Sequence, residues 1–184
     1  NKGKSLDFSK DGNYLIAAGY PLMVWYCNNW SDKNPKIITD SIFIGKRLQI
    51  FDFIRFCHNS NAFGLGSRKK GGILIYDLDR RSIVKRFNLK CNALAFSPDD
   101  KYLAGAGLLG KIRRWNLNSN LQFVTRYSIT EKRWIDSYIA VEISKNGELF
   151  AGGNQNRKIN IFNINNGKTH LIIKGHSAKV NTLA

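Results

Sequence analysis

The chain has 184 residues, of which 43% are hydrophobic and 12% aromatic, and its 29 Lys and Arg residues outnumber 13 Asp and Glu residues, which gives a formal net charge of +16. This apolar content excludes a disordered chain, and no apolar run approaches the roughly 18 residues that a membrane-spanning helix needs. The sequence starts at Asn1, with no charged and then apolar leader after it, so we expect no signal peptide.

One phrase recurs along the chain, with an apolar stretch before and after a short polar turn. The first copy spans 6–19, a weaker copy spans 54–66, and two further copies span 94–107 and 141–153. The apolar residues just before the four turns lie 48, 40 and 47 positions apart, and they are Phe8, Phe56, Phe96 and Ile143. A unit of about forty residues, twice lengthened by an insertion, fits these intervals.

Each unit predicts four antiparallel strands in chain order. The first strand ends at the polar turn, and the second runs from that turn to a stretch of small residues such as 17–19 or 104–107. Small residues there allow neighbouring backbones to approach closely. The third strand carries an aromatic residue near its end, and the fourth follows another polar turn. The aromatic residues that we interpret as structural anchors of the third strands are Trp25, Tyr76, Trp115 and Phe162.

No stretch of a dozen residues shows sustained helical periodicity, so the sequence predicts an all-β protein. Three features are specific: the Phe-Ser-Pro-Asp-Asp turn at 96–100, the strand ends at Trp115 and at Tyr76 and Asp77, and the pair 175–176, Gly175 and His176. In these features the repeats resemble those of the WD40 family of β-propellers. The family's Asp between the second and third strands is missing. We therefore expect its side-chain hydrogen-bond network to be incomplete and the sheets to rely on apolar packing.

The predicted fold class is an all-β, WD40-type β-propeller in which about four four-stranded blades are present. The repeat intervals place these blades at approximately 5–46, 47–90, 91–136 and 137–177, with the start of a further blade at 178–184. The resemblance implies about seven blades in a closed propeller. We therefore expect residues 1–184 to form part of a longer propeller, with unpaired edges at both ends.

The sequence offers no catalytic or metal-binding constellation. The three cysteines, Cys27, Cys57 and Cys91, lie about thirty residues apart without a CxxC pair. This spacing is typical of small apolar core residues in an intracellular protein, cytoplasmic or nuclear. The three histidines are scattered, and His176 belongs to the repeat pattern, where a structural role is favoured. No nucleophile elbow, phosphate-binding loop or HExxH motif is found. We expect a protein that is not an enzyme and that needs no cofactor and no metal.

The excess positive charge falls mainly in the loops before the first strands and between the second and third strands. The resemblance implies that these loops form the usual binding face of a propeller. Solvated surface lysines are the alternative for the cations, and packing over the rim of a blade is the favoured alternative for Trp134. The residues that we assign to partner binding are Arg68, Lys69, Lys70, Lys111, Lys132, Arg133, Trp134, Arg157 and Lys158.

Three functions are compatible with this pattern. The leading interpretation is a non-catalytic scaffold, part of a multi-protein complex, that presents its loops to protein partners with acidic or phosphorylated segments. The second is an RNA-associated protein of the ribosome-assembly type, which would contact phosphates through the basic face. The third is a phosphoinositide-binding propeller, whose paired-arginine signature the stretch 68–72 resembles only loosely.

Overall fold

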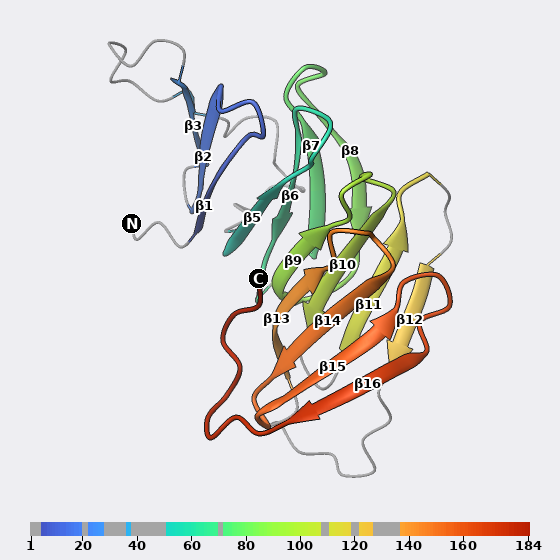
Figure 1. Cartoon of the computed structure of the whole chain (residues 1–184). Coiled ribbons are helices and arrows are strands. Elements are labelled where there is room, and N and C mark those ends of the chain that lie inside the picture. The colour runs from blue at the N-terminus through green and yellow to red at the C-terminus, as the bar shows by residue number, and fades with distance from the viewer. Residues whose placement is uncertain are drawn as a thin grey trace. The chain divides into compact units, whose positions relative to one another are not determined.

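A computed structural model of the chain describes residues 5–19, 22–27, 36–37, 51–69, 72–107, 111–118, 122–126 and 137–184 (Figure 1). Sixteen strands in these residues form four antiparallel four-stranded sheets, and the described ranges contain no α-helix. The predicted all-β architecture is thereby confirmed. The chain divides into an N-terminal unit, Asn1–Lys90, and a C-terminal unit, Cys91–Ala184.

The N-terminal unit contains two sheets in which each strand pairs with its neighbour in the sequence. The first sheet consists of β1 (Ser5–Phe8), β2 (Tyr14–Ala18), β3 (Met23–Tyr26) and β4 (Lys36–Ile37). The second consists of β5 (Phe53–Phe56), β6 (Ala62–Gly66), β7 (Ile73–Asp77) and β8 (Ser82–Phe87).

The C-terminal unit repeats this arrangement with two more sheets. One consists of β9 (Cys91–Phe96), β10 (Tyr102–Gly107), β11 (Lys111–Asn116) and β12 (Gln122–Arg126). The other consists of β13 (Tyr138–Ile143), β14 (Leu149–Asn154), β15 (Lys158–Asn163) and β16 (Thr169–Lys174). Because all pairs are antiparallel and consecutive, the turns after the first and third strands of a sheet lie at one end of its strands. The turn after the second strand lies at the other end.

The two sheets of the N-terminal unit enclose one apolar core. Ile16 and Val24 of the first sheet are buried in the same cluster as Ile54 and Phe63 of the second. A polar contact also joins the sheets, because the Asp7 carboxylate accepts the backbone N–H of Phe56 at 2.8 Å. Apolar burial therefore supplies most of the contact, and Asp7 fixes the position of β1 beside β5.

Alternation along β1 leaves an apolar face uncovered. Side chains of successive residues point to opposite faces of a sheet, so Leu6 and Phe8 point away from the core that Asp7 faces. Leu6 is 63% exposed and Phe8 is 49% exposed, whereas Ile54 and Phe56, at the corresponding positions of β5, are 1% and 6% exposed. The same two positions of the repeat are therefore buried in β5 and exposed in β1.

The C-terminal unit has its own core, in which Phe150 stacks on Phe162 with 4.9 Å between the ring centroids. Gly152 allows the two sheets of this unit to approach closely. A Cβ atom at this position would lie 2.6 Å from Ile112 Cδ1 and 2.7 Å from the Tyr138 ring. Real Cβ contacts are longer than this, so a side chain at position 152 would force Ile112 and Tyr138 to shift.

A buried cation bridges the two sheets of the C-terminal unit. Arg114 of β11 is 1% exposed, and its guanidinium lies 4.6 Å from the centre of the Tyr102 ring. One guanidinium nitrogen donates to the backbone carbonyl of Asn165 at 3.1 Å, and the Tyr102 hydroxyl donates to Asn165 Oδ1 at 3.3 Å. Burial lowers the pKa of Arg114, but an arginine keeps its proton in a folded protein. The turn after β15 is thus held by a charged side chain of the other sheet.

Three of the four turns that follow first strands are closed by the same arrangement, which we call the serine clasp. The Ser hydroxyl donates to a side-chain oxygen two residues later at 2.5–2.6 Å, and it accepts the backbone N–H five residues later at 2.9–3.0 Å. Such clasps satisfy local polar groups at a tight reversal. They are formed by Ser9 with Asp11, Ser97 with Asp99, and Ser144 with Asn146. Cys57 occupies the corresponding position of the fourth turn.

The clasp at Ser97 predicts a defined acid response. The Ser97 hydroxyl, and then the N–H and ammonium groups of Lys101, lower the pKa of Asp99 from its ordinary value of 3.8 to about 2. The ionised form is favoured in the fold, so the stabilisation that it provides is fully present above about pH 4 and is lost as the pH falls towards 2. We expect Ser97→Ala to raise the pKa of Asp99 towards 3.8, as measured by the carboxyl carbon shift in an NMR titration. Ser144→Ala is the control, and an unchanged Asp99 midpoint in Ser97→Ala would contradict the assignment.

Candidate functional site

The turn between β6 and β7 presents two exposed cations, Arg68 and Lys69. The backbone N–H of Arg68 donates to the buried carboxylate of Asp52 at 2.8 Å, and its guanidinium lies 4.7 Å from the centre of the Phe53 ring. The N–H of Lys69 donates to Ser67 Oγ at 3.3 Å. The backbone at Arg68 and Lys69 is therefore held by side-chain acceptors, and both residues are exposed. We call this pair, Arg68 and Lys69, the N-terminal basic turn.

The turn between β14 and β15 presents a similar pair, Arg157 and Lys158, which we call the C-terminal basic turn. Asn154 Oδ1 accepts the N–H of Lys158 at 3.0 Å. Arg157 is exposed and has a φ of +65°, in the left-handed region that favours glycine. Lys111, half-buried at the start of β11, belongs to the same unit and also follows a turn between second and third strands.

The remaining predicted binding residues lie outside the described residues. They are Lys70, Lys132, Arg133 and Trp134. Of the described binding residues, the two pairs are neighbours in the sequence, Arg68 with Lys69 in the N-terminal unit and Arg157 with Lys158 in the C-terminal unit. The binding roles of all nine residues remain predictions.

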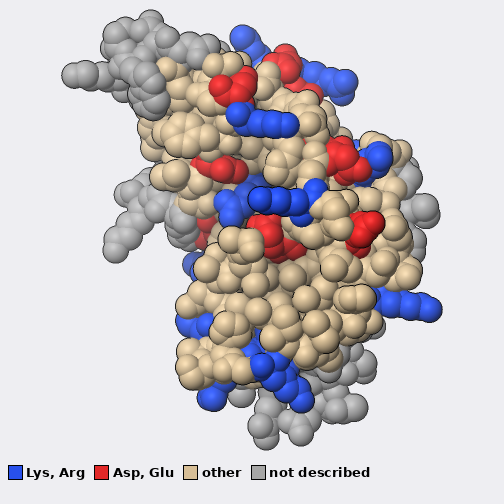
Figure 2. Space-filling view, viewed as in Figure 1, with Lys and Arg blue, Asp and Glu red and all other residues tan. Residues whose placement is uncertain are grey.

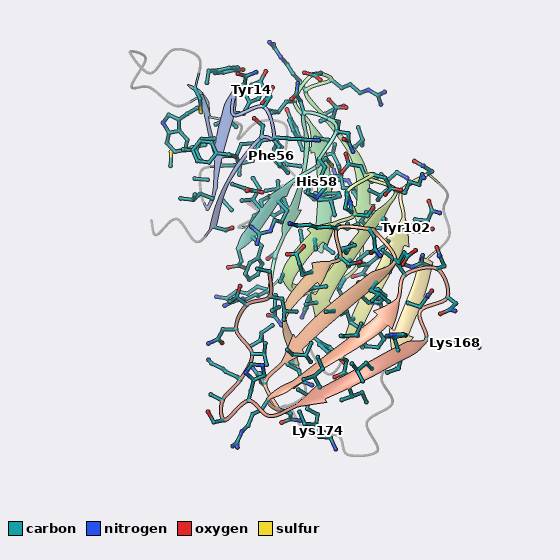
Figure 3. The ribbon with its side chains drawn as sticks, in the orientation of Figure 1. Tyr14, Phe56, His58, Tyr102, Lys168 and Lys174 are labelled. Carbon is teal, nitrogen blue, oxygen red and sulfur yellow. The ribbon has the colours of Figure 1, made fainter. Side chains whose placement is uncertain are left out.

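The turns at the other ends of the strands carry both signs of charge. Lys101 pairs with Asp99 at 3.1 Å, and Arg80 pairs with Asp77 at 3.6 Å. On the face shown in Figure 2, acidic side chains lie close to basic ones in the upper and middle part of the view, and the lower part shows basic side chains without acidic neighbours. Figure 3 marks both ends of β16, with Lys168 just before the strand and Lys174 as its last residue. The cations thus occur at both ends of the strands, but acidic residues accompany them mainly at one end.

The predicted structural anchors differ in their surroundings. Tyr76, Trp115 and Phe162 are buried in the third strands of their sheets, and Trp25 is half-buried. Asp77 caps the following turn, because its Oδ1 accepts the N–H of Asp79 at 2.9 Å and that of Arg80 at 3.0 Å. Gly175 and His176 lie in the exposed segment after β16, and Gly175 has a φ of +140°.

Sequence reasoning missed two polar residues that shape these turns and sheets, Asp52 and Arg114. Asp52 directly precedes β5, at a position where the side chain is 4% exposed. Arg114 alternates with Ile112 on the inward face of β11, and this period-two pattern was a signal that its side chain is buried. A charged residue in an inward position indicates a specific contact, because an unpartnered buried charge is costly.

Neither a metal site nor a membrane span is found in the part of the chain that the structure describes. No group of three or more His, Cys, Asp or Glu side chains in these ranges is placed to hold a metal ion. Among the described residues there is also no helix of the length and apolarity needed to cross a bilayer. All three cysteine side chains are buried, as expected for small core residues.

A comparison with protein-family models matches residues 83–116 to the WD domain, G-beta repeat. The matched segment covers most of β8 and all of β9, β10 and β11. No curated protein matches the chain. Repeats of this family are typical of protein–protein interaction scaffolds. The match identifies a WD40 repeat within residues 83–116, and the four consecutive four-stranded antiparallel sheets are consistent with blades of a WD40-type propeller.

Proposed function

We propose that this chain is a non-catalytic interaction scaffold, a component of an intracellular multi-protein complex, that binds acidic or phosphorylated segments of partner proteins. The N-terminal and C-terminal basic turns carry the proposal. Arg68, Lys69 and Arg157 are exposed and Lys158 is half-buried, and side-chain hydrogen bonds hold the backbone N–H groups of Arg68 and Lys158. Charge-assisted hydrogen bonds from Arg and Lys to carboxylates or phosphates are among the stronger polar contacts that such turns can make.

The backbone of Arg157 is the observation that favours a binding role most. Gly72, which directly precedes β7, has a φ of +71°, and Arg157, which directly precedes β15, has nearly the same φ of +65°. A side chain in this region costs roughly 1 kcal/mol relative to glycine. An exposed arginine at a position suited to glycine is explained if its guanidinium contributes to binding, since strained residues cluster at functional sites.

Binding to an acidic peptide tests the proposal. The probes are a fluorescein-labelled Glu-rich peptide, its phosphoserine counterpart and a Gln-substituted control, and the readout is fluorescence anisotropy. We expect Arg157→Gly to weaken binding of the acidic probes about fivefold. We also expect it to raise the free energy of unfolding by about 1 kcal/mol, because the strain is relieved.

Matched double variants distinguish binding at the basic turns from a nonspecific attraction of the acidic peptide to the positively charged protein. Arg68→Gln with Lys69→Gln removes two charges from the N-terminal basic turn, and Lys145→Gln with Lys168→Gln removes two charges at the opposite ends of the strands. Equal losses in the two double variants would contradict a site at the basic turns. Tighter binding to an RNA oligonucleotide than to either acidic peptide, with a steep salt dependence, would replace the proposal with the RNA-associated alternative.

A further inference from the structure

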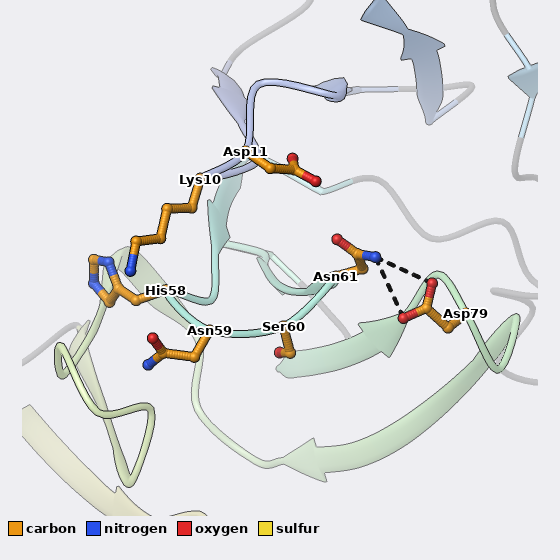
Figure 4. A pocket seen from close by; sticks show the side chains of 7 residues that line it. All are labelled: Lys10, Asp11, His58, Asn59, Ser60, Asn61 and Asp79. Atoms are coloured by element: carbon orange, nitrogen blue, oxygen red, sulfur yellow. Dashed lines mark hydrogen bonds between the residues drawn. The ribbon is translucent and has the colours of Figure 1, made fainter. Parts of the chain in front are cut away.

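A polar groove lies at the other end of the strands in the N-terminal unit, away from the N-terminal basic turn. Its volume is about 660 Å³, and three turns line it: the β1–β2 turn, the β5–β6 turn and the β7–β8 turn (Figure 4). The lining residues are Lys10, Asp11, His58, Asn59, Ser60, Asn61 and Asp79. Grooves of roughly 300–1,000 Å³ are of the size that holds small ligands or a short peptide segment.

The groove has two ends of different chemistry. Figure 4 shows the Lys10 side chain extended towards the His58 ring at one end, while the Asp11 carboxylate points to the side of Asn61 and Asp79. Asn61 Nδ2 donates to the two carboxylate oxygens of Asp79 at 3.2 and 3.3 Å. The floor between the ends consists of amide and hydroxyl groups, which can donate to and accept from a peptide backbone.

The carboxylate of Asp79 is not needed to form its turn. In the β7–β8 turn the capping oxygen belongs to Asp77, and in the β15–β16 turn the same cap is made by Asn163, whose Oδ1 accepts the N–H of Asn165 at 2.9 Å. Asn165 occupies the position of Asp79 in this comparison. Because Asn165 at this position supports the same turn, the negative charge of Asp79 is not required for the turn and can interact with a ligand.

In the C-terminal unit, the corresponding β15–β16 turn accepts a hydrogen bond from a cationic side chain. There the guanidinium of Arg114 lies against Tyr102 and donates to the Asn165 carbonyl at 3.1 Å. In the N-terminal unit the residue that corresponds to Arg114 is the apolar Val24. The N-terminal unit thus has the apolar Val24 where the C-terminal unit has the buried cation of Arg114. Its β7–β8 turn carries the carboxylate of Asp79 where the β15–β16 turn carries the amide of Asn165.

The electrostatics of the N-terminal unit agree with this geometry. Hydrogen bonds from the Ser9 hydroxyl and from the backbone of Asn13 lower the pKa of Asp11, so its carboxylate is ionised at neutral pH. The pKa of Tyr14 is raised by burial and by the nearby Tyr26, Asp79 and Asp11. The two carboxylates therefore create a negative potential at their end of the groove, which attracts a basic group.

We propose that this groove binds an extended peptide segment that carries a basic side chain and, two residues later, an acidic one. The basic group would lie against Asp11 and Asp79, and the acidic group against Lys10 and His58. Residues two apart in an extended peptide point to the same side, so both side chains can enter one groove. The site is separate from the basic turns, and its occupancy does not depend on the function proposed for them.

Binding measurements that remove single charges from the peptide and from the protein test the site. The probe is the peptide Ac-Arg-Gly-Glu-NH2, compared with Ac-Gln-Gly-Glu-NH2 and Ac-Arg-Gly-Gln-NH2, and binding is followed by amide chemical shifts of the labelled protein. We expect each neutralised probe to bind about two- to fivefold more weakly, as partly exposed ion pairs usually contribute this much. The shifts should concentrate in the three lining turns.

The protein variants are Asp79→Asn, which copies the residue of the β15–β16 turn, and Lys10→Gln. Asp79→Asn should reduce the preference for Arg over Gln in the probe, and Lys10→Gln should reduce the preference for Glu over Gln. Lys145→Gln, at the position corresponding to Lys10 in the C-terminal unit, is the control and should change neither. Equal binding of all three probes, unchanged preferences in the variants, or no shifts with several millimolar peptide would overturn the proposal.

Discussion

Gly72→Ala is expected to lower the free energy of unfolding by about 3 kcal/mol, the sum of backbone strain and a steric overlap. Gly72 has a φ of +71°, and a Cβ atom on it would overlap the backbone carbonyl oxygen of Phe87 at the end of β8. A backbone atom cannot rotate away as a side chain does. The β6–β7 turn or strand β8 would have to move, and the pairing of β7 with β8 would weaken. Hydrogen–deuterium exchange in the β6–β8 peptides, together with urea denaturation, measures the effect.

Gly12→Ala is the matched control for the strain alone. Gly12 has a φ of +72°, and nothing lies within 4 Å of the place where its Cβ would be. We expect it to cost about 1 kcal/mol. Losses of similar size in the two variants would show that the overlap with Phe87 is relieved without cost. The predicted close packing of β8 against Gly72 would then be wrong.

Arg114→Ala is expected to lower the free energy of unfolding by about 3 kcal/mol, since it empties a buried volume and leaves the contacts of the β15–β16 turn unmade. Arg114 is 1% exposed and joins Tyr102 to Asn165. Increased amide exchange should appear both in β10–β11 and in the turn after β15, because the side chain connects two sheets. Urea denaturation gives the size of the loss.

Arg114→Met separates the volume of this side chain from its charge. Methionine fills most of the same space, and replacing a buried charge by an apolar group of similar size is often nearly neutral. We expect a loss of about 1 kcal/mol or less. If Arg114→Met is as unstable as Arg114→Ala, the guanidinium contacts and not the filled volume hold the two sheets together.

Features that repeat along the chain could be predicted from the sequence. The polar turns after first strands, the small residues at the ends of second strands and the aromatic residues of third strands each return about every forty residues, and together they identified four sheets. These features depend on local chemistry, such as the contact of Ser97 with Asp99 two residues later. A local pattern is visible in a sequence because its partners are close in the chain.

Contacts between sheets could not be predicted in the same way. Asp7 bonds to the backbone of Phe56, 49 positions away, and Arg114 bonds to Asn165, 51 positions away. The groove at Asp79 was missed for the same reason, since three turns distant in the sequence meet there. The assignment of cations to one set of turns needed only the strand order, and the binding roles of these residues remain predictions.

The serine clasp has a consequence for how such a chain can grow. All residues of the clasp lie within five positions of the serine, so duplication of a repeat copies every residue that the clasp needs. A duplicated blade can therefore form its first hairpin beside any neighbour. The bridge of Arg114, Tyr102 and Asn165 is different, because it draws on two consecutive sheets. Duplication of one sheet alone would separate the members of this bridge, whereas it would leave a clasped hairpin complete.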